Sequence, residues 1–142
     1  MNGLIATAET DIKARPDEVW DALTDPRKIS AYMFGAQVDT TWKPGSRITW
    51  TGEYEGRQYE DHGEILEVDP GRHLKLTHFS PLSGQDDVPE NYHTVTYDLI
   101  ERGDLTHVTL EQDNNSSAEE AEHSAKNWEM MLDGLKRQVE AH

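Results

Sequence analysis

The last 26 residues, Ser117 to His142, are the feature that most constrains how this chain can fold. Apolar side chains recur there at alternating steps of four and three residues, which places them on one face of an α-helix. They are Ala121, Ala125, Trp128, Leu132, Leu135 and Val139, with Met131 beside them. Ser116 and Ser117 each precede a glutamate by three residues, the pattern of a capping box. A long helix with one face to bury is therefore expected.

The residues before this helix predict short strands and two short helices. Leu4 to Lys13 alternates apolar and polar side chains, which is typical of a half-buried strand. Pro16 and Pro26 each suit the first position of a helix, and Gly35 can end the second one. Gly63 is expected to mark a β-bulge. Six further strands, separated by proline and glycine turn signals, are expected over Val38 to Trp42, Arg47 to Tyr54, Gln58 to Val68, Arg72 to Phe79, Tyr92 to Glu101 and Thr106 to Gln112.

This order of elements predicts an α+β fold in which a curved antiparallel sheet of about seven strands wraps around the C-terminal helix. A chain of 142 residues is expected to form one domain, residues 1–142. A domain of this size is large enough to bury a substantial core.

The charge of the chain narrows the classes of partner. The 28 acidic and 13 basic residues give a net charge of -15, so nucleic acid and anionic lipid surfaces are not expected partners. No cysteine is present, which excludes disulfides and thiolate metal sites. The sequence shows no signal peptide and no run of apolar residues long enough to cross a membrane. We expect a soluble cytoplasmic protein.

Five local sequences, taken in order, resemble the SRPBCC superfamily of START and Bet v 1-like proteins. Ile12 to Pro26 is similar to the opening of that superfamily, and the other four are similar to its Hsp90 ATPase activator homologue 1-like branch. Those four are Trp42 to Ser46, Gly63 to Leu74, Val95 to Leu99 and Asn127 to Leu135. The resemblance covers nearly the whole chain and implies the helix-grip fold.

The resemblance also implies a deep cavity between sheet and long helix that holds an apolar or amphipathic ligand. It implies no particular reaction, because the superfamily includes polyketide cyclases, hydroxylase subunits and lipid carriers. The branch is named for a domain that stimulates a chaperone ATPase, and small members like this chain resemble that domain without its accessory N-terminal region.

Strand alternation predicts which side chains face this cavity. If the apolar side chains of each strand point inward, so do Trp50, Tyr54, His78, His93, Tyr97 and Gln112. Trp128 and Met131 would contribute from the long helix, and Met33 and Phe34 from the end of the second short helix. Aromatic walls with a few polar groups are the usual make-up of a small-molecule site. We therefore expect non-covalent binding of an apolar or aromatic small molecule, without a cofactor.

Ordinary packing is an alternative for several of these side chains. Trp20, Trp42 and Trp128 each lie on an otherwise apolar face, as core residues do. Met131, and Met33 with Phe34, fit a cavity wall and a closed core equally well. Tryptophan and methionine side chains could also fill the cavity completely.

An enzyme is the alternative function, cyclase-like or hydrolytic, with His78 or His93 as acid/base and Tyr97 as proton donor. Replacing His93 with Gln would then abolish turnover, whereas a binding protein would keep its affinity. A third alternative is a module that modulates a chaperone or another ATPase through its acidic surface, by salt-sensitive association with an unknown protein partner.

We assign no catalytic residues and no metal ligands. The chain has no Gly-x-Ser-x-Gly elbow, no His-Glu-x-x-His pair and no phosphate-binding glycine loop. Asp61, His62 and Glu64 are potential metal ligands, but strand alternation puts His62 on the face opposite to Asp61.

Overall fold

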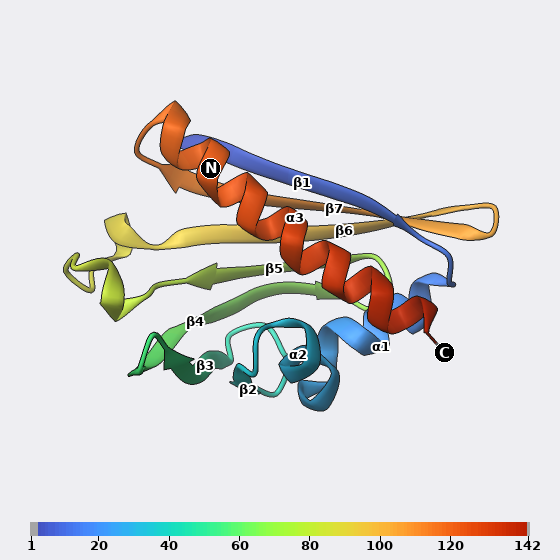
Figure 1. Ribbon diagram of the computed structural model, residues 1–142, viewed down its shortest axis with the longest axis horizontal. Coiled ribbons are helices and arrows are strands. Elements are labelled where there is room, and N and C mark those ends of the chain that lie inside the picture. The colour runs from blue at the N-terminus through green and yellow to red at the C-terminus, as the bar shows by residue number, and fades with distance from the viewer. Residues whose placement is uncertain (1–2, 142) are drawn as a thin grey trace.

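The computed structural model describes residues 3–141, which form seven strands and three α-helices (Figure 1). The strands make one antiparallel sheet in the order β1-β7-β6-β5-β4-β3-β2. The elements are β1 (Leu4–Ile12), α1 (Pro16–Thr24), α2 (Pro26–Tyr32), β2 (Gln37–Asp39), β3 (Arg47–Tyr54), β4 (Arg57–Asp69), β5 (His73–His78), β6 (His93–Arg102), β7 (Leu105–Asn115) and α3 (Ala118–Glu140). Two short 3₁₀ turns, Pro81–Ser83 and Pro89–Asn91, lie in the loop between β5 and β6.

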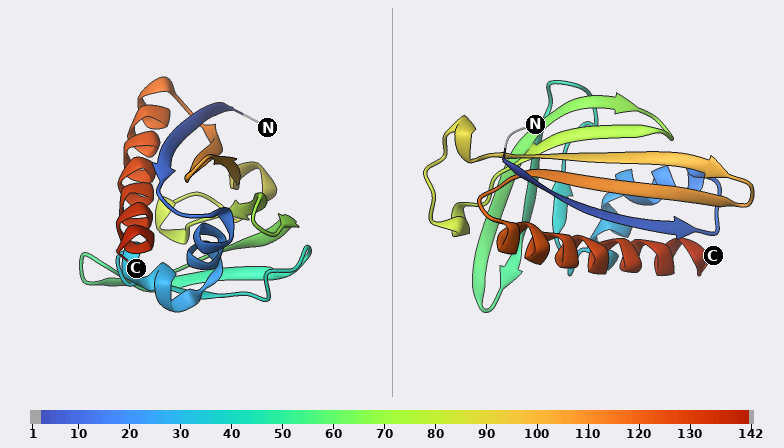
Figure 2. Two further views of the ribbon diagram at one scale, coloured as in Figure 1. Left: turned by 90° about the vertical axis from the view of Figure 1, so that its right-hand side faces the viewer. Right: turned by 90° about the horizontal axis from the view of Figure 1, so that it is seen from above.

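Helix α3 crosses the concave face of the sheet. Figure 1 shows it running diagonally from the ends of β1 and β7 to the region of α1 and α2. Figure 2 shows how strongly the sheet bends, because β3 runs across the direction of β1 and β7. The helix packs mainly against β1 and also contacts α1, α2 and β7. The predicted helix-grip α+β architecture is confirmed.

The core lies between the C-terminal half of α3 and the sheet. Met131, Leu132, Leu135 and Val139 of α3 are between 0% and 8% exposed. They belong to one cluster of buried apolar side chains to which all seven strands contribute, for example through Leu74, Leu99, Val108 and Leu110. Burying one such side chain fully contributes about 1.5–3 kcal/mol. Among the helices, α3 thus contributes the most to the apolar core, through its amphipathic stripe.

Hydrogen bonds at its N-terminus set where α3 begins. Ser117 Oγ accepts from the Glu120 backbone N–H at 3.0 Å, and the Ser116 backbone N–H donates to Glu120 Oε2 at 2.8 Å. The two serines therefore share the reciprocal cap. Just before them, buried Asn115 accepts from Ser124 Oγ at 3.0 Å and donates to Leu4 O at 3.1 Å. This side chain links α3 to both β7 and β1.

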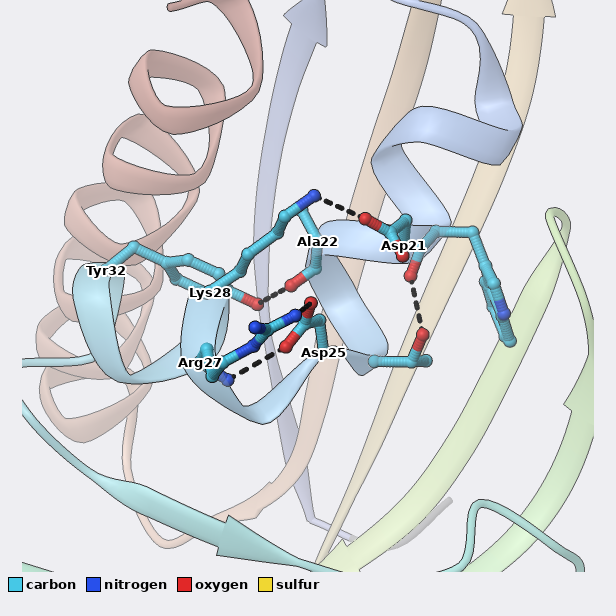
Figure 3. A network of polar contacts seen from close by, with 8 residues as sticks. Asp21, Ala22, Asp25, Arg27, Lys28 and Tyr32 are labelled. Carbon is cyan, nitrogen blue, oxygen red and sulfur yellow. Dashed lines mark hydrogen bonds and ion pairs between the residues drawn. The ribbon is translucent and has the colours of Figure 1, made fainter. Parts of the chain in front are cut away.

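A second polar network holds α1 against α2 (Figure 3). Asp25 caps α2 by accepting from the Arg27 backbone N–H at 2.9 Å. Lys28 forms an ion pair with Asp21, and the buried Tyr32 hydroxyl donates to Ala22 O at 3.0 Å. The two short helices are thereby held as one unit beneath the C-terminal end of α3.

The structure differs from the sequence prediction in two local features. The second strand is shorter than expected, since it ends at Asp39, and Trp42 has a positive φ of 60°. The irregularity in β4 is also displaced, because Gly63 pairs regularly with Ile48 and the register shift lies between Ile65 and Glu67. Gly63 is required for another reason: a Cβ placed there would lie 1.8 Å from the Thr77 carbonyl oxygen.

We predict that Gly63→Ala lowers the free energy of unfolding by about 2–3 kcal/mol, because the methyl group would force β4 and β5 apart. Urea denaturation measures the change. Glu64→Ala is the matched control, since Glu64 is exposed on the same strand, and we expect it to change stability by less than about 0.5 kcal/mol. A Gly63→Ala variant as stable as this control would contradict the close approach.

Two histidines on the convex face each lie between two carboxylates. His73 Nδ1 is 2.6 Å from Asp98 Oδ1 and its Nε2 is 2.8 Å from Glu67 Oε1. His107 Nδ1 is 2.8 Å from Asp11 and its Nε2 is 3.0 Å from Glu9. The hydrogen bond to Asp98 is the main cause that raises the pKa of His73, and the hydrogen bond to Asp11 does the same for the pKa of His107.

These raised pKa values predict that stability falls as pH rises above neutrality. The protonated histidines stabilise the fold fully below the pKa of about 6.5 for unfolded histidine, and this contribution is lost as pH passes the raised folded pKa. The double variant His73→Gln with His107→Gln should show a flatter slope of unfolding free energy between about pH 6 and pH 9. His123→Gln, at an exposed position of α3, is the control that should keep the slope.

Candidate functional site

One end of the concave face carries polar and aromatic side chains from five adjacent strands. We call this set the polar cluster; it consists of Trp50 on β3, Asp61 on β4, His78 on β5, His93 on β6 and Gln112 on β7. Strand register brings these residues together, since Trp50 pairs with Asp61 and His78 pairs with His93. The His78 ring lies 5.0 Å from the Trp50 ring and 6.5 Å from the His93 ring, measured between centroids.

Asp61 and His78 form a hydrogen-bonded pair at the centre of the polar cluster. His78 Nε2 is 2.8 Å from Asp61 Oδ2, and the two side chains are 23% and 16% exposed. An ionised carboxylate only accepts hydrogen bonds, so Nε2 carries the proton that it donates to Asp61. In the neutral imidazole the other nitrogen, Nδ1, then has a free lone pair and can accept a proton or a hydrogen bond.

His93 has the opposite arrangement of ring nitrogens. Its Nδ1 is 2.8 Å from the backbone oxygen of Asp113, which can only accept. Nδ1 is therefore the protonated nitrogen of the neutral ring, and Nε2 has the lone pair. The polar cluster thus presents two imidazoles whose donor nitrogens are both used within the protein.

Three atoms of the polar cluster are buried without a protein partner. Asp61 Oδ1, His78 Nδ1 and Gln112 Oε1 make no hydrogen bond within the part of the chain that the structure describes. Leaving a buried polar atom unsatisfied costs about 1–3 kcal/mol, so such atoms are few in folded proteins and call for an explanation. Three of them within one cluster distinguish this end of the sheet from the apolar core beside it.

The structure brings four of the predicted lining residues together and places two in the closed core. Trp50, His78, His93 and Gln112 are the four that share the polar cluster. Tyr97 and Met131 are only 8% and 3% exposed and pack within the apolar core. Burial raises the pKa of Tyr97 far above its ordinary value, so the phenol stays protonated.

The remaining predicted lining residues lie elsewhere. Trp128 and Met33 are partly buried against the edge of the core. Phe34 is 78% exposed, so the expectation that it faces the interior is wrong. It follows the end of α2 with a positive φ of 56°, which turns its side chain outward. The Tyr54 side chain lies outside the described residues.

Sequence reasoning missed Asp61 and Tyr59 as inward-facing side chains. The turn at Glu55 and Gly56 carried the necessary signal, because a two-residue hairpin loop fixes the register of its strands and so places Asp61 opposite Trp50. Tyr59 lies over Gly52, where an added Cβ would be 2.7 Å from the Tyr59 hydroxyl oxygen. Desolvation, followed by the charge of Asp61, raises the pKa of Tyr59.

The burial of α3 changes along its length. Its C-terminal half is closed onto the sheet, but the inward-facing residues of its first half are only partly buried; these are Ala121, Ser124, Ala125 and Trp128. Three of the four have small side chains. Figure 1 shows that the first half of α3 does not cross the start of β4 or the end of β5. The first half of α3 therefore covers the concave face less completely than its second half does.

Two shallow hollows open at the surface among the helices, away from the polar cluster. One, of about 270 Å³, is lined mainly by α1 residues and the end of α3, including Asp17, Asp21 and Val139. The other, of about 220 Å³, lies between α2 and α3 and includes Phe34 and Met130. Neither contains any residue of the polar cluster, and their walls carry exposed charges or edges of the core.

Two features are absent from residues 3–141. In that range no group of three or more His, Asp or Glu side chains is placed to hold a metal ion. None of the described helices is long and apolar enough to cross a membrane.

The sequence matches the model of one known protein family. The family model described as "Activator of Hsp90 ATPase homolog 1-like protein" matches residues 13–140. The chain belongs to this family. The predicted membership of the Hsp90 ATPase activator homologue 1-like branch is therefore confirmed, and with it the SRPBCC superfamily. No curated protein sequence gives a significant match.

Solved structures agree with this assignment. The solution structure of ChR145 from Cytophaga hutchinsonii has a TM-score of 0.86 and 46% identity, over 99% of this chain and 97% of that chain. The Aha1 dimer from Colwellia psychrerythraea has a TM-score of 0.73 and 17% identity over 96% of each chain. DynU16, from the dynemicin biosynthetic locus, has a TM-score of 0.79 and 19% identity over 96% of this chain and 47% of its own. The last two likenesses show a shared fold.

We predict that His78 and His93 adopt opposite tautomers when neutral. Long-range ¹H–¹⁵N NMR at about pH 8 should show His78 protonated on Nε2 and His93 on Nδ1. Asp61→Asn should alter the pattern of His78 and leave that of His93 unchanged. The matched control is Glu60→Gln, the same chemical change at an exposed neighbouring position of β4. Identical tautomers in the wild-type protein would contradict the hydrogen bonds described here.

Proposed function

We propose that this protein binds an apolar or aromatic small molecule non-covalently, between the polar cluster and the first half of α3. The observation that supports this most directly is the change of burial along one helix face. The inward-facing side chains of the second half of α3 are almost completely buried, whereas those of the first half are not. A helix face that starts half-buried over polar side chains suits a site that closes over a ligand.

The side chains around this region suit an aromatic or apolar ligand. Trp50 and Trp128 are partly buried and lie against the core, so each has ring surface left to contact a ligand. Aromatic rings provide large contact areas with little loss of conformational entropy. The histidines and Gln112 would orient the ligand, which is the usual division between apolar walls and a few polar groups.

The closed second half of α3 limits where the ligand can lie. Leu132 and Leu135 are both 0% exposed and pack against the sheet. Tyr97 and Met131, which the sequence predicts to line the site, form the boundary of this closed core. We therefore propose that the ligand lies on the side of Tyr97 that carries His78 and His93. We expect its affinity to depend little on substitutions in α3 that are C-terminal to Met131.

Charge sets the remaining limits on partners. With a net charge of -15 the chain would repel polyanions, so we expect a small molecule rather than nucleic acid, in a cytoplasmic setting. Polyanionic partners would need a basic patch, and the side chains of the polar cluster include neither lysine nor arginine.

We predict that Ala125→Phe removes ligand binding by filling the space between α3 and the sheet. Native mass spectrometry of protein purified from its own host should show a stoichiometric small molecule on the wild type and little on the variant. Lys126→Phe is the matched control, because it adds the same ring on the exposed face of α3 and should keep the ligand.

Stability separates a binding space from solid packing in the same experiment. If the space exists, Ala125→Phe should fold with a thermal midpoint close to that of Lys126→Phe. If side chains already fill it, the added ring should cost about 1–3 kcal/mol. A wild type that carries no ligand, together with a strongly destabilised Ala125→Phe, would overturn the proposal.

A further inference from the structure

We infer that the ligand presents hydrogen-bond donors, hydroxyl or ammonium groups, to the polar cluster and that carboxylates and phosphates are rejected. This inference rests on the proposed function and names the chemistry that the same site selects. It follows from which atoms of the polar cluster are already paired and which are not.

The hydrogen bond between Asp61 and His78 decides whether the remaining free atoms of these two side chains donate or accept hydrogen bonds. Nε2–H of His78 is engaged with Asp61 Oδ2 at 2.8 Å, so the only N–H of the neutral ring points at the carboxylate. The atoms left over are Nδ1 of the imidazole and Oδ1 of the carboxylate, both buried and without a protein partner among the described residues. Both are acceptors.

Gln112 adds a third acceptor from the opposite side of the cluster. Its side chain projects from β7, two strands away from His78 in the sheet order. The residue is only 7% exposed, yet Oε1 has no hydrogen-bond partner in the described part of the chain. Strands lie about 4.8 Å apart, so Gln112 and His78 are separated by roughly 10 Å along the sheet. A ring-sized ligand can span this distance.

His93 lies between these acceptors and extends the same pattern. Its Nδ1–H is used by the backbone oxygen of Asp113 at 2.8 Å, so its free ring nitrogen is also an acceptor when the ring is neutral. The buried unpaired atoms of the polar cluster are thus acceptors, and the cluster's own donors, the Trp50 indole N–H and the Gln112 amide group, make no hydrogen bond with them. No protein group donates to these buried atoms among the described residues, so a ligand that supplies donors satisfies atoms that an ether or hydrocarbon would leave unpaired.

Electrostatics excludes the opposite class of ligand. A carboxylate or phosphate would meet Asp61 and several lone pairs, with no lysine or arginine in the polar cluster to neutralise it. An ammonium group would instead face the carboxylate and could also contact the Trp50 ring, whose centroid is 5.0 Å from that of His78. Neutral hydroxyls and cations therefore share the required chemistry, and the experiment separates them.

The test uses four probes with one ring system and different polar groups. They are 2-naphthol, 2-(aminomethyl)naphthalene, 2-methoxynaphthalene and 2-naphthoate, titrated at about pH 8 while the ¹H–¹⁵N spectrum reports on the Trp50 indole. We expect the alcohol or the amine, or both, to bind about tenfold more tightly than the methoxy compound, because one added hydrogen bond is worth about that ratio. Naphthoate should bind most weakly.

Two variants assign the selectivity to the polar cluster. Asp61→Asn replaces an acceptor-only group with one that also donates, so the preference for donors should shrink and naphthoate should gain affinity relative to the wild type. Gln112→Leu is a second variant that removes the buried Oε1 acceptor, together with the amide N–H donors, without changing charge. Glu60→Gln is the matched control on the exposed face of β4 and should leave the order of the probes unchanged.

The outcomes separate this inference from the proposed function. Equal affinity of naphthol, amine and ether, or tightest binding of naphthoate, would overturn donor selectivity while leaving apolar binding intact. Donor selectivity that survives both Asp61→Asn and Gln112→Leu would show that other residues cause it and would also overturn the inference. If none of the four probes binds, the proposed function fails and the inference fails with it.

Discussion

The packing of α3 against the concave face of the sheet is the interaction on which the rest of this structure depends. Leu132 and Leu135 are completely buried there, together with apolar side chains from the central strands. The helix buries its stripe against the sheet, and together with α1 and α2 it covers the concave face. Because the helix crosses diagonally, this contact is tight at one end only. The same interaction that builds the core therefore leaves the polar cluster thinly covered.

Most of the fold was predictable because its signals are local and periodic. The spacing of apolar residues in α3 and the alternation in β1 identify helix and strand directly, and proline with glycine marks the turns. Gly63 shows where this reasoning is limited. A glycine within a strand indicates either a bulge or a close approach, and only the position of Thr77 in space shows that it is the close approach. Such contacts depend on the curvature of the whole sheet.

The candidate site was predictable in part for the same reason. Strand alternation correctly predicts that Trp50, His78 and Gln112 point to the concave face. It cannot distinguish a partly exposed side chain from a completely buried one. Tyr97 has the same alternation as His93 and yet lies in the core, where Tyr32 of α2 is one of its neighbours. Asp61 entered the sequence analysis only as a potential metal ligand beside His62 and Glu64, and not as part of the site. Its hairpin register, read from the turn at Glu55, would have corrected this.

The hydrogen bonds of Asn115 bear on the route by which a molecule could reach the interior. This buried side chain links Ser124 of α3 to the backbone of Leu4, so the first turns of the helix are attached to both β7 and β1. Separating the helix from these strands would break a buried polar link, whereas no comparable link is found between α3 and β3 or β4 among the described residues. A ligand of the proposed kind would therefore meet the fewest polar links to α3 on the side of β3 and β4, whereas the Asn115 links lie on the side of β1 and β7.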